Sequence, residues 1–374
     1  MTRHEKYYTM FLKTKHVHTH GHGKKTSHRK VRWLLLLVLW FLFVLGLGIP
    51  KGLAQQPQNN GIVKALGSIG MTVSEMDRSV HFFSKVLSFE KASDTELAGS
   101  EYERLMGVFG LRIRVVHMKL GDQSIRLTQY IAPPDGRPIP VPSRSNDLWF
   151  QHMAIIVSDM DSAYQRVREY KVRQISPNPQ TIPKSNVGAA GIKAFKFRDP
   201  DGHNLELLWF PTGKGDPRWH QSKGKLFLGI DHTAITVSDT KASLNFYRDL
   251  LGMKILGHGL NLGITQERLD NLFGARVRIT GIGPPVKPPN MEFLEYETPQ
   301  GGRPLPLNTR ANDIWHWQTQ LVVDDVDSVA KWLRNNNVRF VTPRISHLPG
   351  GKLGFKKGIM VRDPDGHAMM MVEK

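Results

Sequence analysis

The sequence contains no cysteine, and it has fewer acidic than basic side chains, 33 against 51. Without cysteine the chain cannot form a disulfide, a thiolate metal site or a cysteine nucleophile. The net charge of +18 is unevenly distributed: residues 1–32 carry nine Lys or Arg and one acid, Glu5, which gives +8 within less than a tenth of the chain. Elsewhere we find no dense basic stripe interleaved with aromatic residues, so nucleic-acid binding is not expected.

The first 54 residues divide into two segments. Residues 1–32 are basic and His-rich, and we expect them to form a disordered polar tail. Residues 33–49 are an apolar run without a charge, at the lower length limit for a membrane span. The segment 33–54 is therefore predicted to be a membrane anchor, in contact with the membrane through residues 33–49, or a signal peptide cleaved after Ala54. In either case the cationic flank would stay in the cytoplasm, which places the rest of the chain on the non-cytoplasmic side.

The remaining sequence is internally repeated. The motif Asp-Pro-Asp-Gly-His occurs at 199–203 and again at 363–367, each time before a short apolar strand. Asp-Pro favours entry into a turn, and Gly tolerates the positive φ needed to leave it. Around these motifs the chain divides into four similar units, at residues 62–134, 149–211, 226–300 and 314–374. Alternating apolar residues predict that each unit opens with a strand, and helical spacing predicts that an amphipathic helix follows.

The connections between the units are repeated as well. The segment that begins with Arg137-Pro-Ile-Pro and ends at Asp147 returns as Arg303-Pro-Leu-Pro, ending at Asp313. A paired functional role is conceivable, but Pro stiffens a long connection, so we favour a rigid crossover between units.

Four βαβββ units with this turn before the last strand resemble the vicinal oxygen chelate superfamily, which includes glyoxalase I, extradiol dioxygenases and bleomycin-resistance-type binding proteins. The resemblance covers residues 62–374. It implies an α+β fold of four units that form two cupped-sheet, glyoxalase-like barrels, with halves at 62–211 and 226–374. In this family two units enclose one divalent metal ion, and each unit offers one ligand from its first strand and one from its last.

Carried onto this chain, the resemblance gives four pairs of ligand positions. They are Ser68 and Arg126, His152 and Glu206, His232 and Glu292, and Gln318 and Met370. Neutral imidazole and carboxylate suit a divalent ion, whereas an Arg would repel one and a Met suits only soft metals. If the second unit pairs with the third, His152, Glu206, His232 and Glu292 form one complete site. Pairing in sequence order would leave two defective sites, so we favour the crossed pairing and expect one ion of Zn, Ni, Mn or Fe.

Such a site implies metal-dependent chemistry on a small oxygenated substrate. The glyoxalase-like lyase or isomerase reaction would pass through a metal-stabilised enediolate, with Glu206 or Glu292 as the catalytic base. An extradiol dioxygenase is the first alternative. In that reaction the family uses a Tyr three residues before the turn motif, where this chain has Lys196 and Met360. A binding module without turnover is the second alternative. The expected partner is a small molecule, and a monomer is possible.

Overall fold

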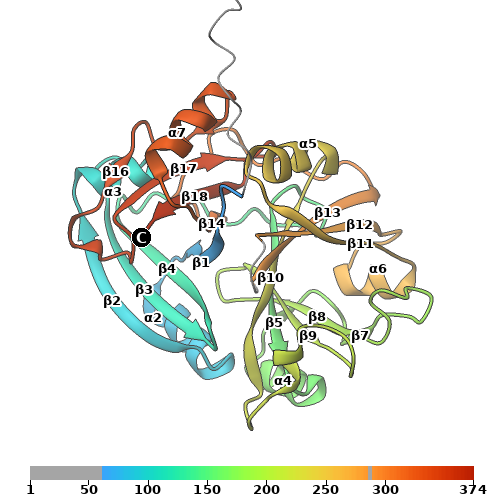
Figure 1. The fold of residues 1–374 in the computed structure, drawn as a ribbon. Helices are drawn as coiled ribbons and strands as arrows, with labels where there is room; N and C mark the ends of the chain where they lie inside the picture. Colours follow the sequence, from blue (N-terminus) through green and yellow to red (C-terminus); the bar gives the residue numbers. More distant parts are fainter. Residues whose placement is uncertain (1–60, 285–288) are drawn as a thin grey trace, which may run out of the picture. The chain divides into compact units, whose positions relative to one another are not determined.

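The computed structural model describes residues 61–284 and 289–374, which form two curved nine-stranded sheets (Figure 1). The outer-unit sheet combines the first unit with the fourth, and the inner-unit sheet combines the second with the third. The outer-unit sheet runs in the order β15 (Arg339–Phe340), β17 (Lys357–Arg362), β18 (Ala368–Glu373), β14 (Trp317–Val322), β1 (Ala65–Thr72), β4 (Gln123–Ala132), β3 (Arg112–Leu120) and β2 (Glu90–Ala98), with β16 (Ser346–His347) paired to β17. The inner-unit sheet runs in the order β11 (Lys254–Leu262), β12 (Arg276–Gly283), β13 (Asn290–Thr298), β10 (Phe227–Thr236), β5 (Phe150–Val157), β9 (Asn204–Trp209), β8 (Lys193–Arg198) and β6 (Arg173–Gln174), with β7 (Gln180–Thr181) paired to β8.

The sheets therefore have the crossed pairing that the ligand positions favoured. At the centre of each sheet the first strands of two units pair antiparallel, β1 with β14 and β10 with β5. On the far side of each central strand, the last strand of the same unit pairs parallel to it. This arrangement brings the first and last strands of two units side by side on one concave face.

The helices that follow the first strands lie between the two sheets. They are α2 (Met76–His81), α4 (Met160–Glu169), α5 (Thr240–Leu244) and α7 (Val326–Asn335), and α2 and α5 continue as π-helical turns at Phe82–Val86 and Asn245–Leu250. Each begins after an acidic residue whose side chain accepts hydrogen bonds from the first-turn backbone N–H groups. Such caps satisfy donors that have no partner within the helix.

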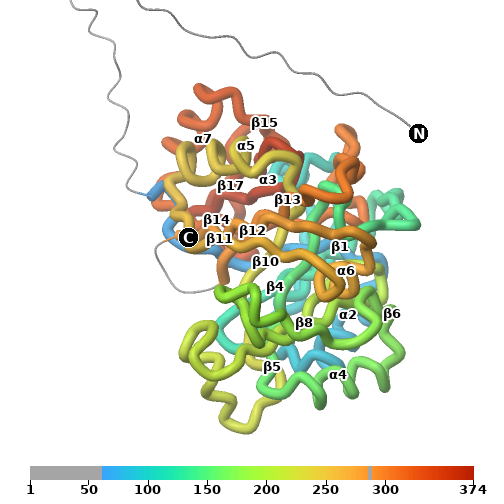
Figure 2. The backbone as a smooth tube through the Cα atoms, turned by 90° about the vertical axis from the view of Figure 1, so that its right-hand side faces the viewer, coloured from blue at the N-terminus to red at the C-terminus, as the bar shows by residue number. Residues whose placement is uncertain are grey.

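The hydrophobic cores join units that are consecutive in sequence. One buried cluster contains Phe83 after α2 and Ala163 of α4 together with strand residues of both sheets. The second contains Tyr247 and Leu333, from the helices of the third and fourth units. Figure 2 shows α5 and α7 side by side, and both helices contribute to this second core. Each fully buried large apolar side chain contributes roughly 1.5–3 kcal/mol, so consecutive units are held by their cores and crossed units by their sheets.

The units depart from the simple βαβββ pattern in two respects. In the first and third units a short helix follows the second strand, α3 (Ser100–Met106) and α6 (Ile264–Asp270). In the second and fourth units the second strand has only two residues, β6 and β15, and an additional short strand follows it. Single turns of 3₁₀ helix at Pro217–His220 and Pro349–Gly351 complete the described secondary structure.

The repeated turn motif is stabilised by its own aspartate. Asp199 accepts the backbone N–H groups of residues 201–203 on one oxygen and bonds the His203 ring at 2.8 Å with the other. Asp363 does the same for His367 in the second copy. Gly202 has φ +103° and Gly366 φ +98°, a region that side chains disfavour. Both histidines therefore bond around the turn.

The repeated connectors are joined by reciprocal ion pairs. Arg303 forms a two-pronged contact with Asp147, at 2.9 and 2.6 Å, and lies over the Trp149 ring. Arg137 forms the same contact with Asp313. Because each aspartate is almost fully buried, these pairs fix the crossovers.

The prediction of a membrane-anchored or exported protein is corrected. Within residues 61–284 and 289–374, no helix is long and apolar enough to span a membrane. The longest, α4 and α7, have ten residues. Ten residues rise about 15 Å, against a hydrocarbon core of about 30 Å. The tail at 1–32 and the predicted anchor or signal at 33–54 lie outside the described residues.

Candidate metal centre

The four predicted ligands lie on four adjacent strands of the inner-unit sheet. His152 is on β5 and His232 on β10, while Glu206 on β9 and Glu292 on β13 flank them. In the register, Ala154 pairs with Glu206 and Ala234 with Glu292, so corresponding positions of two units face each other. The alternate residues of β9, Leu205 and Leu207, point into the core between the sheets, which turns the carboxylates to the concave face.

The side chains converge on one point. The His152 Nε2 atom lies 3.3 Å from the His232 Nε2 atom and 3.0 Å from the Glu206 carboxylate. The His232 Nε2 atom lies 3.5 Å from the Glu292 carboxylate. Ligand atoms of His152, Glu206 and His232 all lie within 4.8 Å of one another. With metal–ligand bonds near 2.1 Å, adjacent ligand atoms of one ion are about 3 Å apart, so this spacing suits a shared ion.

Neighbouring polar groups set the orientation of both rings. The His232 Nδ1 atom bonds Asp231 at 2.9 Å, and the His152 Nδ1 atom contacts the side-chain oxygen of Gln151. A ring that donates its Nδ1 proton presents the Nε2 lone pair, which is the form that binds a metal ion. In both rings it is Nε2 that faces the convergence point.

Charge at this point is unevenly distributed. Burial lowers the pKa of His152 to about 4, so this ring is neutral. Burial opposes protonation of His232 too, but Glu292 and Asp231 outweigh it and raise the pKa to about 9. Burial alone would raise the pKa of Glu206, yet His152 and Lys196 lower it to about 2. Burial raises the pKa of Glu292, and the nearby Glu206 adds to the effect.

The donor set fits a divalent cation. Two Nε2 atoms face each other at 3.3 Å, and lone pairs at that distance repel unless a positive charge lies between them. In the protein without a metal, a proton on His232 supplies that charge, and the neighbouring carboxylates stabilise it by raising the pKa of the ring. Imidazole nitrogens with carboxylate oxygens are suitable ligands for Zn, Ni, Mn or Fe. His152, Glu206, His232 and Glu292 would hold the ion.

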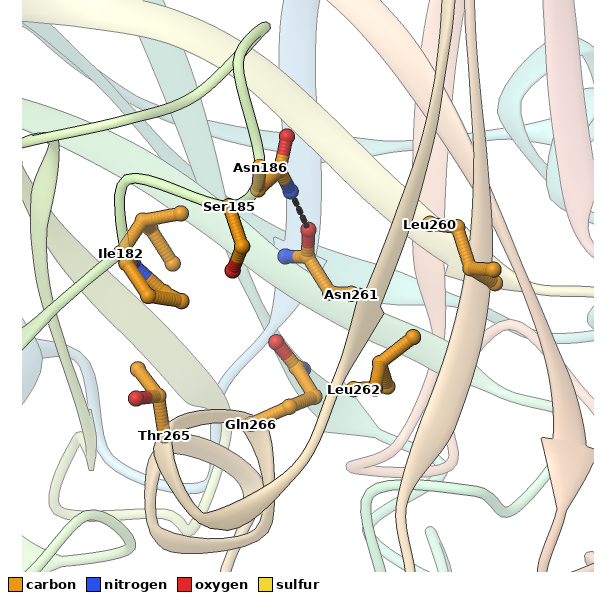
Figure 3. Close-up of a pocket in the computed structure, with 9 residues that line it drawn as sticks. Ile182, Ser185, Asn186, Leu260, Asn261, Leu262, Thr265 and Gln266 are labelled. Atoms are coloured by element: carbon orange, nitrogen blue, oxygen red, sulfur yellow. Dashed lines mark hydrogen bonds between the residues drawn. The ribbon is translucent and has the colours of Figure 1, made fainter.

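A cavity of about 420 Å³ opens beside this centre. His232 and Glu292 reach its wall, as do His258, Asn261 and Asn290. A second cavity of about 210 Å³ adjoins it and shares Asn186 and Asn261. Figure 3 shows the hydrogen bond of 2.7 Å between these two amides, which stands where the cavities meet.

The other predicted positions gather in the outer-unit sheet and carry no comparable set. Ser68 bonds the Ser124 hydroxyl at 2.6 Å. The Gln318 amide lies 4.0 Å from the Met370 sulfur, and Arg126 lies over the Phe355 ring. This sheet therefore lacks the chemistry of the inner-unit centre.

A second cluster of acids and histidine, Asp199, Asp201 and His203, is close enough to hold an ion. Its oxygens are already engaged: Asp199 holds the turn, and Asp201 bonds Ser74 and Arg78 of the first unit. We therefore assign this cluster to the fold.

Sequence reasoning missed a buried polar network behind the histidines. Lys196 on β8 donates to Asp270 at 2.7 Å and to Gln151 at 3.3 Å, and the Tyr296 hydroxyl donates to Asp270 at 2.7 Å. Gln151 in turn contacts His152, so the network reaches a predicted ligand. The one feature of the sequence that could have indicated this network is the charged Lys196 between two phenylalanines of a strand. Asp270 at the end of α6 gave none.

Comparison with known proteins agrees with this fold. The family model of the Glyoxalase/Bleomycin resistance protein/Dioxygenase superfamily matches residues 65–207 and 229–371. The chain therefore belongs to this superfamily, as the resemblance to vicinal oxygen chelate proteins predicted.

Two curated relatives match less than half of the chain, and a solved structure matches most of it. A 2-epi-5-epi-valiolone epimerase of Actinomyces sp is 30% identical over 153 residues, which are 40% of this chain and 81% of the epimerase. The uncharacterized protein YwbC of Bacillus subtilis (strain 168) is 28% identical over 138 residues, 37% of this chain and 90% of that protein. The crystal structure of glyoxalase I from Zea mays superposes with a TM-score of 0.52 at 15% identity, covering 83% of this chain and 92% of the maize chain. At that identity the likeness concerns the fold alone.

Proposed function

We propose that the chain is a metal-dependent epimerase or isomerase that moves a proton at a carbon next to a carbonyl group. The observation that carries the proposal is the convergence of His152, Glu206, His232 and Glu292 beside a polar cavity. This is the lyase or isomerase class expected from the resemblance. The 30% identity to an epimerase supports epimerisation within that class.

A divalent ion bound by these four side chains would act as a Lewis acid on a substrate oxygen, which acidifies the neighbouring C–H bond. The two carboxylates differ in what they can do. Glu292 reaches the cavity wall, and its side chain keeps 28% of its surface exposed. The Glu206 side chain is 6% exposed and bonded to His152. Glu292 is therefore the ligand that would move between the ion and the substrate proton, while Glu206 and the two histidines would hold the ion throughout.

The cavity favours an uncharged, hydroxylated substrate. Apart from His232 and the carboxylates at the centre, its described polar wall groups are amides and His258, with no Lys or Arg among them. The Asn290 side-chain oxygen is buried and has no hydrogen-bond partner within the described chain. A substrate hydroxyl would satisfy it. A small polyhydroxylated ketone fits these groups.

The extradiol alternative has no such support. Lys196 occupies the position at which that reaction uses a Tyr, and its ammonium group is committed to Asp270. A binding module without turnover remains the competing account, and it is separated from the enzyme by experiment.

The test combines metal content with proton exchange. The purified chain should bind one divalent ion, and His232→Ala should bind none. In D₂O, the metal-loaded protein should exchange the hydrogen next to the carbonyl of 2-epi-5-epi-valiolone or a related hydroxylated ketone, as followed by NMR. Glu292→Gln should slow exchange by about a hundredfold or more, while Glu297→Gln, near the end of the same strand and paired with Arg276 and Arg278 instead, should not. Metal binding without exchange on any such ketone would leave the binding module.

A further inference from the structure

The concave face of the outer-unit sheet carries the opposite charge at the position of a predicted metal ligand. In the inner-unit sheet Glu292 pairs in register with Ala234, and in the outer-unit sheet Arg126 pairs in the same way with Gly70. Arg126 thus stands where the other half of the chain has a carboxylate. A site that repels cations at this place is electrostatically prepared for an anion.

Arg126 faces the concave side of its sheet. Its neighbours Ile125 and Leu127 are fully buried in the core between the sheets, so the strand alternation turns Arg126 the other way. The guanidinium lies 5.9 Å from the centre of the Phe355 ring. Burial lowers the pKa of Arg126 to about 10, which leaves it charged at neutral pH.

This guanidinium has no counter-charge. Among the described residues, no carboxylate or hydrogen-bond acceptor contacts the Arg126 side chain. Two buried cations do have partners: Lys196 pairs with Asp270, and Arg362 donates to two carbonyl oxygens. Arg126 is partly buried, and a cation with reduced hydration and no counter-charge is disfavoured, so a ligand that supplies the missing charge would bind favourably here.

A second donor without a partner lies directly across from it. His117 on β3 pairs in register with Arg126, and its Nε2 atom is buried and has no hydrogen-bond partner within the described chain. Burial lowers the pKa of His117 to about 4, with Arg126 adding to the effect, so the ring is neutral and can donate one N–H. A guanidinium and an imidazole side by side offer several donors to one oxyanion.

We propose that the concave face of the outer-unit sheet binds the carboxylate of a small organic acid, held by the Arg126 guanidinium with His117 as a second donor. The planar guanidinium matches a carboxylate with two parallel hydrogen bonds. The surroundings of the guanidinium are apolar, with Phe355 and Met370 almost fully buried in the cluster of this face, which favours an acid with an apolar body over inorganic phosphate. This site is separate from the metal centre and does not depend on its function.

The test is calorimetric titration of the metal-free full chain with benzoate, acetate and inorganic phosphate. Removing metal prevents a carboxylate from binding to an ion at the other centre. We expect saturable binding with benzoate tightest. Arg126→Met should weaken benzoate about tenfold to a hundredfold, and Arg126→Lys, which keeps charge but loses the two-pronged geometry, should weaken it less. Arg112→Met, an exposed position on the neighbouring strand β3, is the matched control and should bind as the parent does.

Each result decides the question. Equal benzoate affinity in the parent and in Arg126→Met would overturn the assignment to Arg126. Absence of saturable binding by all three anions would overturn the site, and tighter phosphate than benzoate would overturn the organic acid. Because Arg126→Met removes a charge that has no partner, its thermal midpoint without ligand should equal or exceed that of the parent, which separates lost binding from lost folding.

Discussion

The buried pair of Lys196 and Asp270 allows a sharp prediction, because the chain contains its own apolar version. Lys196 and Asp270 are 3% and 0% exposed at their side chains, and the atoms lie 2.7 Å apart. The corresponding residues of the outer-unit sheet, 164 positions later or earlier, are Met360 and Met106. Both are buried in the apolar cluster of that face. The same fold is therefore built once with an ion pair and once with two methionines.

Lys196→Met should cost about 3–5 kcal/mol of unfolding free energy, because it leaves the Asp270 carboxylate buried with only Tyr296 and Gln266 as donors. The double variant Lys196→Met/Asp270→Met copies the outer-unit sheet and should return to within about 1 kcal/mol of the parent. Urea unfolding at pH 7 across the double-mutant cycle measures both values.

Lys193→Met is the matched control for this cycle. It lies on the same strand, and its partner Asp161 is 81% exposed at 3.7 Å, so its loss should cost below about 1 kcal/mol. A single variant at Lys196 that is as stable as the parent, or a double variant as unstable as the single one, would refute the reasoning.

The stable double variant also tests what the pair does. Lys196 bonds Gln151, which orients His152, so its loss should lower metal affinity about tenfold to a hundredfold in a protein that still folds. Unchanged metal affinity would show that the pair serves only packing.

Three further predictions follow from single contacts. Asp199 raises the pKa of His203 against the effect of burial. The resulting stabilisation is complete below pH 6.5 and is lost as the pH rises through the folded-state pKa of His203. The urea midpoint should therefore fall over this pH range, and His203→Asn should make the plot of urea midpoint against pH flatter. Because a proton competes for His232, apparent zinc affinity should rise about tenfold per pH unit and level off near pH 9, as measured with a buffered chelator. Arg303→Ala should cost about 3 kcal/mol in urea unfolding, since the buried Asp147 loses its counter-charge and keeps only backbone N–H donors.

Each of these predictions has its own control. His220→Asn, at an exposed histidine, should keep the pH slope of the parent. Asp231→Asn removes a group that raises the His232 pKa, so the zinc affinity should level off at lower pH. Arg112→Ala breaks an exposed pair with Glu96 and should cost below about 1 kcal/mol. Each contact would be contradicted by its own measurement: an unchanged pH slope in His203→Asn, a zinc-affinity plateau that stays near pH 9 in Asp231→Asn, or a cost for Arg303→Ala no larger than that for Arg112→Ala.

The sequence predicts the repeated architecture because its signals are local. Strand alternation, the acidic helix caps and the Asp-Pro-Asp-Gly-His turn each lie within a few residues, and each occurs in matching places of the two halves. The crossed pairing of units is a long-range property. It was favoured because suitable ligands, His152 with Glu206 and His232 with Glu292, remain in only two of the four units.

The features that escaped prediction depend on contacts distant in sequence. Lys196 and Asp270 are 74 residues apart, and nothing near either residue marks its partner. The helices α3 and α6 have seven residues each, too few for a helical period to stand out. The lack of a counter-charge at Arg126 also could not be predicted from the sequence. It depends on where every acidic side chain lies in the folded chain.

The duplication separates what maintains the fold from what serves a site. Residues that recur in both halves, such as His203 and His367 or Arg137 and Arg303, form the same contacts twice, and those contacts hold turns and crossovers. Positions on the concave faces diverge instead. Glu292 is replaced by Arg126, which reverses the charge while the strand register is kept. Met106 and Met360 of the outer-unit sheet correspond to Asp270 and Lys196 of the inner-unit sheet, so the frame accepts apolar and charged residues at the same positions. Charges of opposite sign on an unchanged frame are what we expect if the two faces recognise ligands of opposite charge, as proposed: a cation on the inner-unit sheet and an anion on the outer-unit sheet.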